Sequence, residues 1–187
     1  RKRVNLAFIT GRHRTVLRAT RRTRRGDSSV QLMCRCGSVR MTGDLDAASA
    51  IGARAYEAAT AEGRHDRAAN AAFQWAMALT WSGRLDEAEE CIQLHLEPVA
   101  AITDSRWLAW AQFTRAAIAI HRGNGATAIG LLDRAALRFD AERLIDGMVS
   151  VATVELVALR QVGDDEARLR RRDRLAGQVE RRERGSY

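Results

Sequence analysis

The sequence predicts an all-α protein built as a solenoid of helical hairpins, and three observations favour this class. The glycines at positions 43, 83, 123 and 163 keep a spacing of forty residues. Each follows a long run rich in alanine and other apolar residues, and the chain has one proline and no useful length of strand-like alternation. Since one hairpin cannot bury its own apolar face, neighbouring hairpins must stack into an array with one concave side.

The four glycines set the expected elements. Glycine takes positive φ without a Cβ penalty and is typical of the residue that ends a helix. Acidic residues follow three of the four glycines, where the first turn of a new helix favours negative charge. The expected helices are 28–41 and 46–62, 66–81 and 86–97, 104–121 and 126–139, and 143–161 with 164–182. Loops are expected at Gly63–Asp66, and at Pro98 with Thr103–Ser105.

Small residues recur twelve positions before an alanine that follows each of the first three of these glycines. Such pairs let the two helices of a hairpin approach closely. The pairs are Cys36 and Ala48, Ala76 and Ala88, and Ala116 and Ala128.

Charge divides the chain into three parts. The formal net charge is +8, yet residues 1–25 carry ten basic residues and no acid, and residues 168–187 carry eight arginines against three acids. The residues between them are therefore acidic, at −7. We expect a basic N-terminal segment at 1–26, a repeat array at 27–167 and a basic C-terminal helix or tail at 168–187. The stretch 8–18 is either the remnant of an earlier elbow, with Val16 in the alanine position, or a basic tail that is only partly helical.

The three cysteines, Cys34, Cys36 and Cys91, form an odd set in a chain of 187 residues. This number favours a reducing compartment, so a cytoplasmic location is expected. Neither a membrane span nor a signal peptide is evident. Cys91 and His95 would share a helix face, but zinc needs four ligands in matched pairs. Buried structural thiols are the preferred interpretation, and no metal or cofactor is expected.

The segments Phe73–Trp81, "FQWAMALTW", and Ser82–Ile92, "SGRLDEAEECI", resemble the tetratricopeptide repeat. The resemblance covers roughly residues 28–168, although the spacing is forty rather than about 34 residues. Longer repeats of this type are similar to the superhelical sensor region of large LuxR-type and antibiotic-regulatory bacterial transcription regulators. The resemblance implies a non-catalytic domain that binds a peptide, a partner protein or a small effector in its concave groove. In that family the region lies between an ATPase module and a DNA-binding module, and no motif of either is present here.

The resemblance also places the inner helix of each hairpin along the groove, where side chains three to four positions apart share a face. A stripe of Phe, Met and Trp at this spacing is also typical of a helix core, so both interpretations stay open. The candidate ligand-binding residues are Asn70, Phe73, Met77 and Trp81 in the second repeat, and Trp110, Phe113, Thr114 and His121 in the third.

Two alternatives to this function remain. A nucleic-acid-binding accessory protein would use the arginines at the ends, above all Arg21, Arg22, Arg24 and Arg25, to contact phosphates. No aromatic residue is interleaved there to stack on bases. A homo-oligomer could form instead, because incomplete terminal repeats would leave apolar surface uncovered. No catalytic constellation is defined by spacing, so an enzyme is not expected.

Overall fold

The computed structural model describes residues 13–19 and 28–173, and every regular element among them is a helix. The all-α class is therefore confirmed. The chain divides into two compact units, Arg1–Ala111 and Gln112–Tyr187, so the division falls within helix α8 (Ser105–His121).

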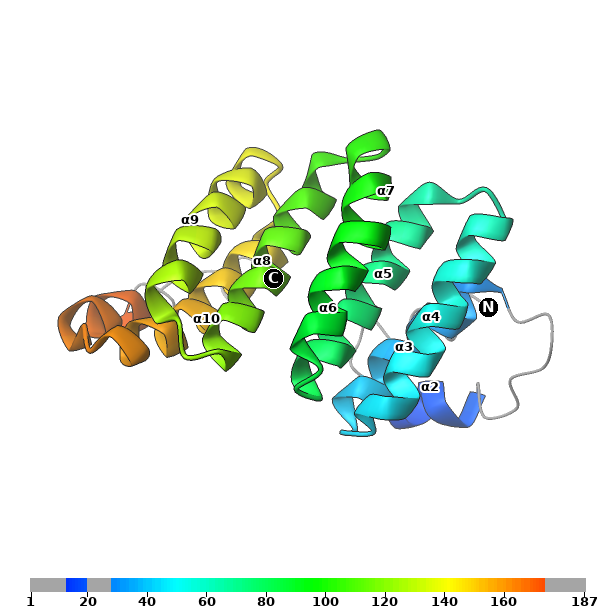
Figure 1. Ribbon diagram of the computed structural model, residues 1–187, viewed down its shortest axis with the longest axis horizontal. Coiled ribbons are helices and arrows are strands. Elements are labelled where there is room, and N and C mark those ends of the chain that lie inside the picture. Colours follow the sequence, from blue (N-terminus) through cyan, green and yellow to red (C-terminus); the bar gives the residue numbers. More distant parts are fainter. Residues whose placement is uncertain (1–12, 20–27, 174–187) are drawn as a thin grey trace, which may run out of the picture. The chain divides into compact units, whose positions relative to one another are not determined.

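In the first unit, helices that follow one another in sequence pack side by side (Figure 1). Helix α2 packs on α3, α3 on α4, and α4 on α5. Three further helical segments, which continue without a break, all pack against α5. The bounds are His13–Ala19 for α2, Ser29–Met41 for α3, Leu45–Ala61 for α4, His65–Trp81 for α5, Leu85–Cys91 for α6, Ile92–Leu96 for the π-helical η1 and Glu97–Ile102 for α7.

The turns confirm the role predicted for the four glycines and add two positions. Gly43, Gly83, Gly123 and Gly163 all have positive φ, and so does Gly63. Arg143, with φ of 53°, is the one non-glycine residue with positive φ among those described. The six positions lie twenty residues apart except for a gap at 103, where Thr103 follows α7 with a φ of −113°. At five of them, the residue after the turn donates its backbone N–H to a carbonyl five positions earlier, as Arg84 does to Leu79 at 3.0 Å.

The expected helices match the observed ones closely, with one exception at Pro98. This proline was expected to mark a loop, but it lies in the first turn of α7, so that expectation is wrong. A proline ring normally clashes with the carbonyl four positions earlier, and proline has no N–H to donate. The wider π-helical turn of η1 comes directly before it and accommodates both effects. The loop begins only after Ile102.

Small residues bring the helices together, as the sequence predicts. Cys36 and Ala48 are completely buried, and the Cys36 thiol donates to the Ala48 carbonyl at 3.2 Å. Gly52 on α4 makes a closer approach, because a Cβ there would lie 2.9 Å from the Cα of Trp75 on α5. The α4–α5 pair therefore packs backbone against backbone at this point.

Near the N-terminus, α2 covers part of the stretch 8–18, for which the sequence leaves two interpretations open. Val16 is completely buried and packs in a cluster with Cys34 and Val30 of α3. His13–Ala19 is therefore helical and packed on α3, which agrees with a partial repeat and with a partly helical basic tail alike. Gly11, the proposed elbow glycine, lies outside the described residues.

The second unit contains α9 (Gly125–Ala141) and α10 (Ile145–Val162), which pack on each other, and a helical segment at 165–173. The completely buried ring of Phe139 lies over Gly147, where a Cβ would come within 2.5 Å of the ring. The carboxylate of Glu155, itself 8% exposed, forms an ion pair with Arg171. This pair connects α10 to the segment that follows Gly163.

Candidate functional site

The predicted binding residues of α5 form one stripe that differs in exposure along its length. Met77 is buried at 4% exposure, Asn70 and Phe73 are half-buried, and Trp81 is 40% exposed. The Phe73 ring lies 4.8 Å from that of Trp110 on α8, so the structure brings two predicted residues together. Trp81, at the last position of α5, is the predicted side chain of this stripe that is most open to a partner.

The remaining predicted residues lie in the second unit. Phe113 is 6% exposed and Thr114 is completely buried, whereas His121 is exposed. That any of these residues binds a partner stays a prediction. The four arginines of the nucleic-acid alternative, Arg21, Arg22, Arg24 and Arg25, lie outside the described residues.

Arg40, on the last turn of α3, is a functional candidate that the sequence analysis missed. Its guanidinium lies 4.3 Å from the centre of the Trp81 ring and donates to the Gln74 side chain at 3.0 Å. Its buried Nε atom has no hydrogen-bond partner, and no carboxylate among the described residues forms an ion pair with it. Burial lowers the pKa of Arg40 because desolvation disfavours its charged form. We call Arg40, Gln74 and Trp81 the Arg40 patch.

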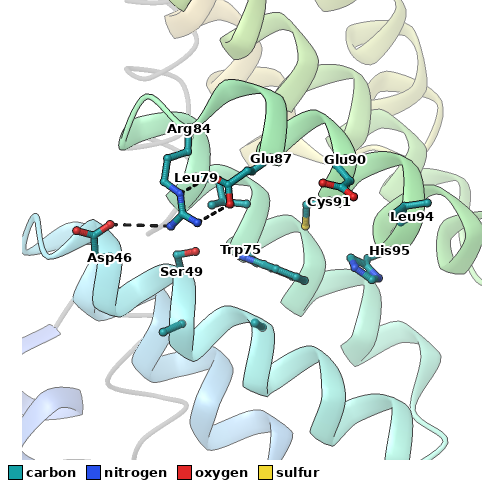
Figure 2. A pocket seen from close by; sticks show the side chains of 12 residues that line it. Asp46, Ser49, Trp75, Leu79, Arg84, Glu87, Glu90, Cys91, Leu94 and His95 are labelled. Atoms are coloured by element: carbon teal, nitrogen blue, oxygen red, sulfur yellow. Dashed lines mark hydrogen bonds and ion pairs between the residues drawn. The ribbon is translucent and has the colours of Figure 1, made fainter.

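A hollow of about 400 Å³ lies elsewhere in the same unit, between α4 and the α6–η1 segment and above α5 (Figure 2). Two residues of α5, Trp75 and Leu79, line it, and they lie on a different face of the helix from Phe73, Met77 and Trp81. Two positions along a helix correspond to a rotation of about 200°. The lining residues are Asp46, Ser49, Ala50, Ala53, Trp75, Leu79, Arg84, Glu87, Glu90, Cys91, Leu94 and His95.

The aromatic side of the hollow is built from three helical segments. The His95 ring stacks on Trp75, with 5.2 Å between ring centres and 23° between planes. Tyr56 of α4 packs on His95 at 4.7 Å in a tilted arrangement. The π-helical turn of η1 places His95 in this position, between side chains of α4 and α5. Ring pairs at such distances add to the packing free energy and restrain the rings.

The polar side of the hollow is mostly acidic. The Arg84 guanidinium donates hydrogen bonds to both oxygens of Glu87, from Nε to Oε1 at 2.7 Å, and it lies 4.0 Å from the Asp46 carboxylate. The hydrogen bond to Glu87 raises the pKa of Arg84, and the same bond lowers the pKa of Glu87. Glu90 forms no ion pair with a basic side chain in the described part of the chain. Three carboxylates and one arginine therefore line the hollow.

The cysteines are buried and free, as preferred from the sequence. Cys91 lines the hollow beside His95, but burial raises the pKa of its thiol to about 12, so it is neutral at physiological pH. Among residues 13–19 and 28–173, no group of three His, Cys, Asp or Glu side chains is placed to hold a metal ion. Within the same residues, no helix has both the length and the apolar character needed to cross a bilayer.

Sequence signals for the hollow were present but ambiguous. Trp75 lies within the segment that carries the repeat resemblance, and Glu87 and Glu90 had the pattern of a solvated helix face. The π-helical turn that directs His95 toward Trp75 has no signature that a 3.6-residue period would reveal. Comparison with the models of known protein families, with curated proteins and with solved structures finds no match to this chain.

Proposed function

We propose that this chain is a non-catalytic helical-repeat domain that binds a peptide or a partner protein. In this proposal the helical hairpins stack as a solenoid, and the inner helices of the array, α3 and α5 in the first unit, present the contact surface. The observation that carries the proposal is the Arg40 patch. A largely buried guanidinium without a carboxylate partner stacks there on a large, exposed apolar ring.

Two physical features of the patch favour binding. Arginine and tryptophan are the side chains most often responsible for binding free energy at protein interfaces. The Arg40 guanidinium has already lost much of its hydration in the folded protein. A ligand carboxylate could therefore form a charge-assisted hydrogen bond with it without a further free-energy cost for desolvating the arginine. The patch therefore suits a peptide segment in which an acidic group lies beside an apolar side chain.

The resemblance to sensor regions places such a domain in a bacterial transcription regulator, where binding of a partner or small effector would alter the array. This part of the proposal rests on the resemblance alone. The contact surface can be tested without the neighbouring modules, because its three side chains lie within one compact unit.

The test is selection of random displayed peptides on the purified chain, followed by affinity measurements on the enriched peptides. Three variants are compared: Trp81→Ala, Arg40→Gln, and the control Ile102→Ala, which removes another exposed apolar side chain of the same unit. We expect enriched peptides that share an acidic residue next to an apolar one. Trp81→Ala and Arg40→Gln should each weaken binding by about tenfold or more, roughly 1.4 kcal/mol, and Ile102→Ala should leave it unchanged.

Circular dichroism and a thermal melt on each variant show whether the variant is still folded, so that a loss of binding is not mistaken for unfolding. The proposal fails if no peptide is enriched over a protein of unrelated fold. It also fails if the enriched peptides bind the Ile102→Ala and Trp81→Ala variants equally well.

A further inference from the structure

The hollow above Trp75 combines an aromatic surface with an excess of negative charge. Stacked Trp75 and His95 supply the aromatic surface. Figure 2 shows Glu90 at the His95 end of the hollow, and Asp46 and Glu87 around Arg84. None of these residues belongs to the Arg40 patch. The function proposed for the Arg40 patch therefore does not account for the hollow.

The internal ion pairs leave part of this negative charge without a partner. Arg84 is contacted by two carboxylates, Glu87 at hydrogen-bond distance and Asp46 at 4.0 Å. One guanidinium can balance only one of the three acids that line the hollow. The neighbouring Cys91 thiol is neutral, since burial raises its pKa to about 12, so it adds no further negative charge to the hollow.

We propose that the hollow is a binding site for an arginine side chain of a basic peptide segment. A planar guanidinium can stack on the face of an indole, the ring that attracts cations most strongly, and at the same time donate to a carboxylate. Trp75 supplies the ring, and Glu90 supplies a carboxylate that no described basic side chain pairs with.

The size and charge of the hollow agree with this ligand. A volume of about 400 Å³ is at the small end of ligand sites, which suits one long side chain with its flanking backbone rather than a large cofactor. Carboxylates repel phosphate groups, so the excess of acids disfavours a nucleic acid here. The ligand would be of opposite charge to the one proposed for the Arg40 patch, and the two sites can be occupied independently.

The experiment is a titration followed by nuclear magnetic resonance. The probe is a blocked pentapeptide, Ala-Ala-Arg-Ala-Ala, and the matched control peptide replaces its arginine with glutamine. The chain has four tryptophans, so four indole N–H signals are expected, and each is assigned by a Trp→Phe substitution. We expect the arginine peptide to shift the Trp75 indole and His95 ring signals to saturation, and to leave the Trp81 signal in place.

Protein variants then test the carboxylate. Glu90→Gln should weaken binding about threefold, which is the range for one exposed ion pair, and Glu90→Lys should weaken it by roughly tenfold or more because it adds repulsion. The control Glu57→Gln removes an exposed carboxylate of α4 that does not line the hollow, and it should change nothing. Glu90 is exposed, so these variants are expected to fold, and unchanged signals of Trp107 and Trp110 verify this.

Three results would overturn the proposal. The first is equal affinity for the arginine and glutamine peptides, and the second is an equal loss of affinity in Glu57→Gln and Glu90→Gln. The third is a shift confined to Trp81. Retained binding of the arginine peptide by Trp81→Ala would support the hollow even if the peptide selection on the Arg40 patch had failed, so the two proposals fail separately.

Discussion

The Asp66 carboxylate, in the first turn of α5, accepts a hydrogen bond from the Trp107 indole Nε1 on the first turn of α8 at 3.0 Å. The same oxygen accepts a second hydrogen bond, from Arg106 Nη2 at 2.9 Å. Two helix starts that lie about forty residues apart are thereby joined through one carboxylate oxygen. Burial alone would raise the pKa of Asp66, but the hydrogen bonds from Trp107 and Arg106 together outweigh it, and the net pKa is lowered.

This lowered pKa predicts a pH dependence of stability. Because the folded-state pKa lies below the unfolded value of about 3.9, the stabilisation is fully present above that value and is lost as pH falls through the folded-state pKa. The Asp66→Asn variant should be less stable than wild type by roughly 1 kcal/mol or less at pH 7, since the carboxylate is largely exposed. The difference should shrink below about pH 4.

Urea unfolding of both proteins between pH 7 and pH 3 measures this difference. Asp133→Asn, an exposed carboxylate on α9, serves as the control. A stability difference for Asp66→Asn that stays constant down to pH 3 would contradict the assignment.

Two glycines inside helices should respond in opposite directions to alanine. Gly147→Ala places a Cβ about 2.5 Å from the Phe139 ring, and we expect a loss of about 1–3 kcal/mol from overpacking. Nothing lies within 4 Å of a Cβ at Gly130, in the interior of α9. Gly130→Ala should therefore gain roughly 0.5–1 kcal/mol, since alanine loses less backbone entropy on folding. Denaturant midpoints at constant m-value measure both changes. A Gly147→Ala variant at least as stable as wild type would refute the packing at Phe139, and a destabilised Gly130→Ala variant would refute the open space at Gly130.

The turn between α9 and α10 should be improved by a glycine. Arg143 adopts positive φ, which costs a residue with a Cβ about 1–2 kcal/mol. Glycine avoids this cost, but its larger conformational entropy in the unfolded chain offsets roughly 0.5–1 kcal/mol of the gain. We expect Arg143→Gly to raise the free energy of unfolding by roughly 0.5–1 kcal/mol.

Gly83→Ala is the matched reverse test for this turn. No atom would meet the added Cβ, so only its φ of 80° opposes alanine, and a comparable loss is expected. If Arg143→Gly proved destabilising, the left-handed conformation of Arg143 would be contradicted.

The three thiols should be nearly inert in the folded protein. All three are buried, and burial raises the pKa of Cys36 and of Cys91 to about 12, and that of Cys34 in the same direction. The thiolate fraction of a group with this pKa is on the order of 10⁻⁴ at pH 8. A disulfide reagent such as Ellman's should react slowly with the native chain, and with three thiols at once after denaturation in guanidinium. A thiol that reacts within seconds in the native protein would show that its burial is wrong.

The helix ends were predictable from sequence because the signals that set them are local. A glycine at positive φ and an acidic first turn act within a few residues, so the ends of α3, α4 and α5 agree with expectation to within one residue. Pro98 was misjudged because its effect depends on the backbone before it. The Arg40 patch and the hollow could not be predicted, because each joins side chains that lie far apart in sequence. Arg40 and Gln74 are 34 positions apart, and Trp75 and His95 are 20 positions apart.

By itself, the sequence determined that this chain is all-helical and where most of its helices begin and end. Periodicity, turn glycines and small residues such as Cys36 and Ala48 encode this information within one or two neighbouring elements. Only the tertiary structure decided which aromatic side chains are buried and which are open. Met77 and Trp81 repeat at the same spacing on α5, yet one is 4% exposed and the other 40%. The exposed fraction of each side chain depends on how far the neighbouring helices extend over it. The sequence of α5 alone does not encode where those neighbouring helices end.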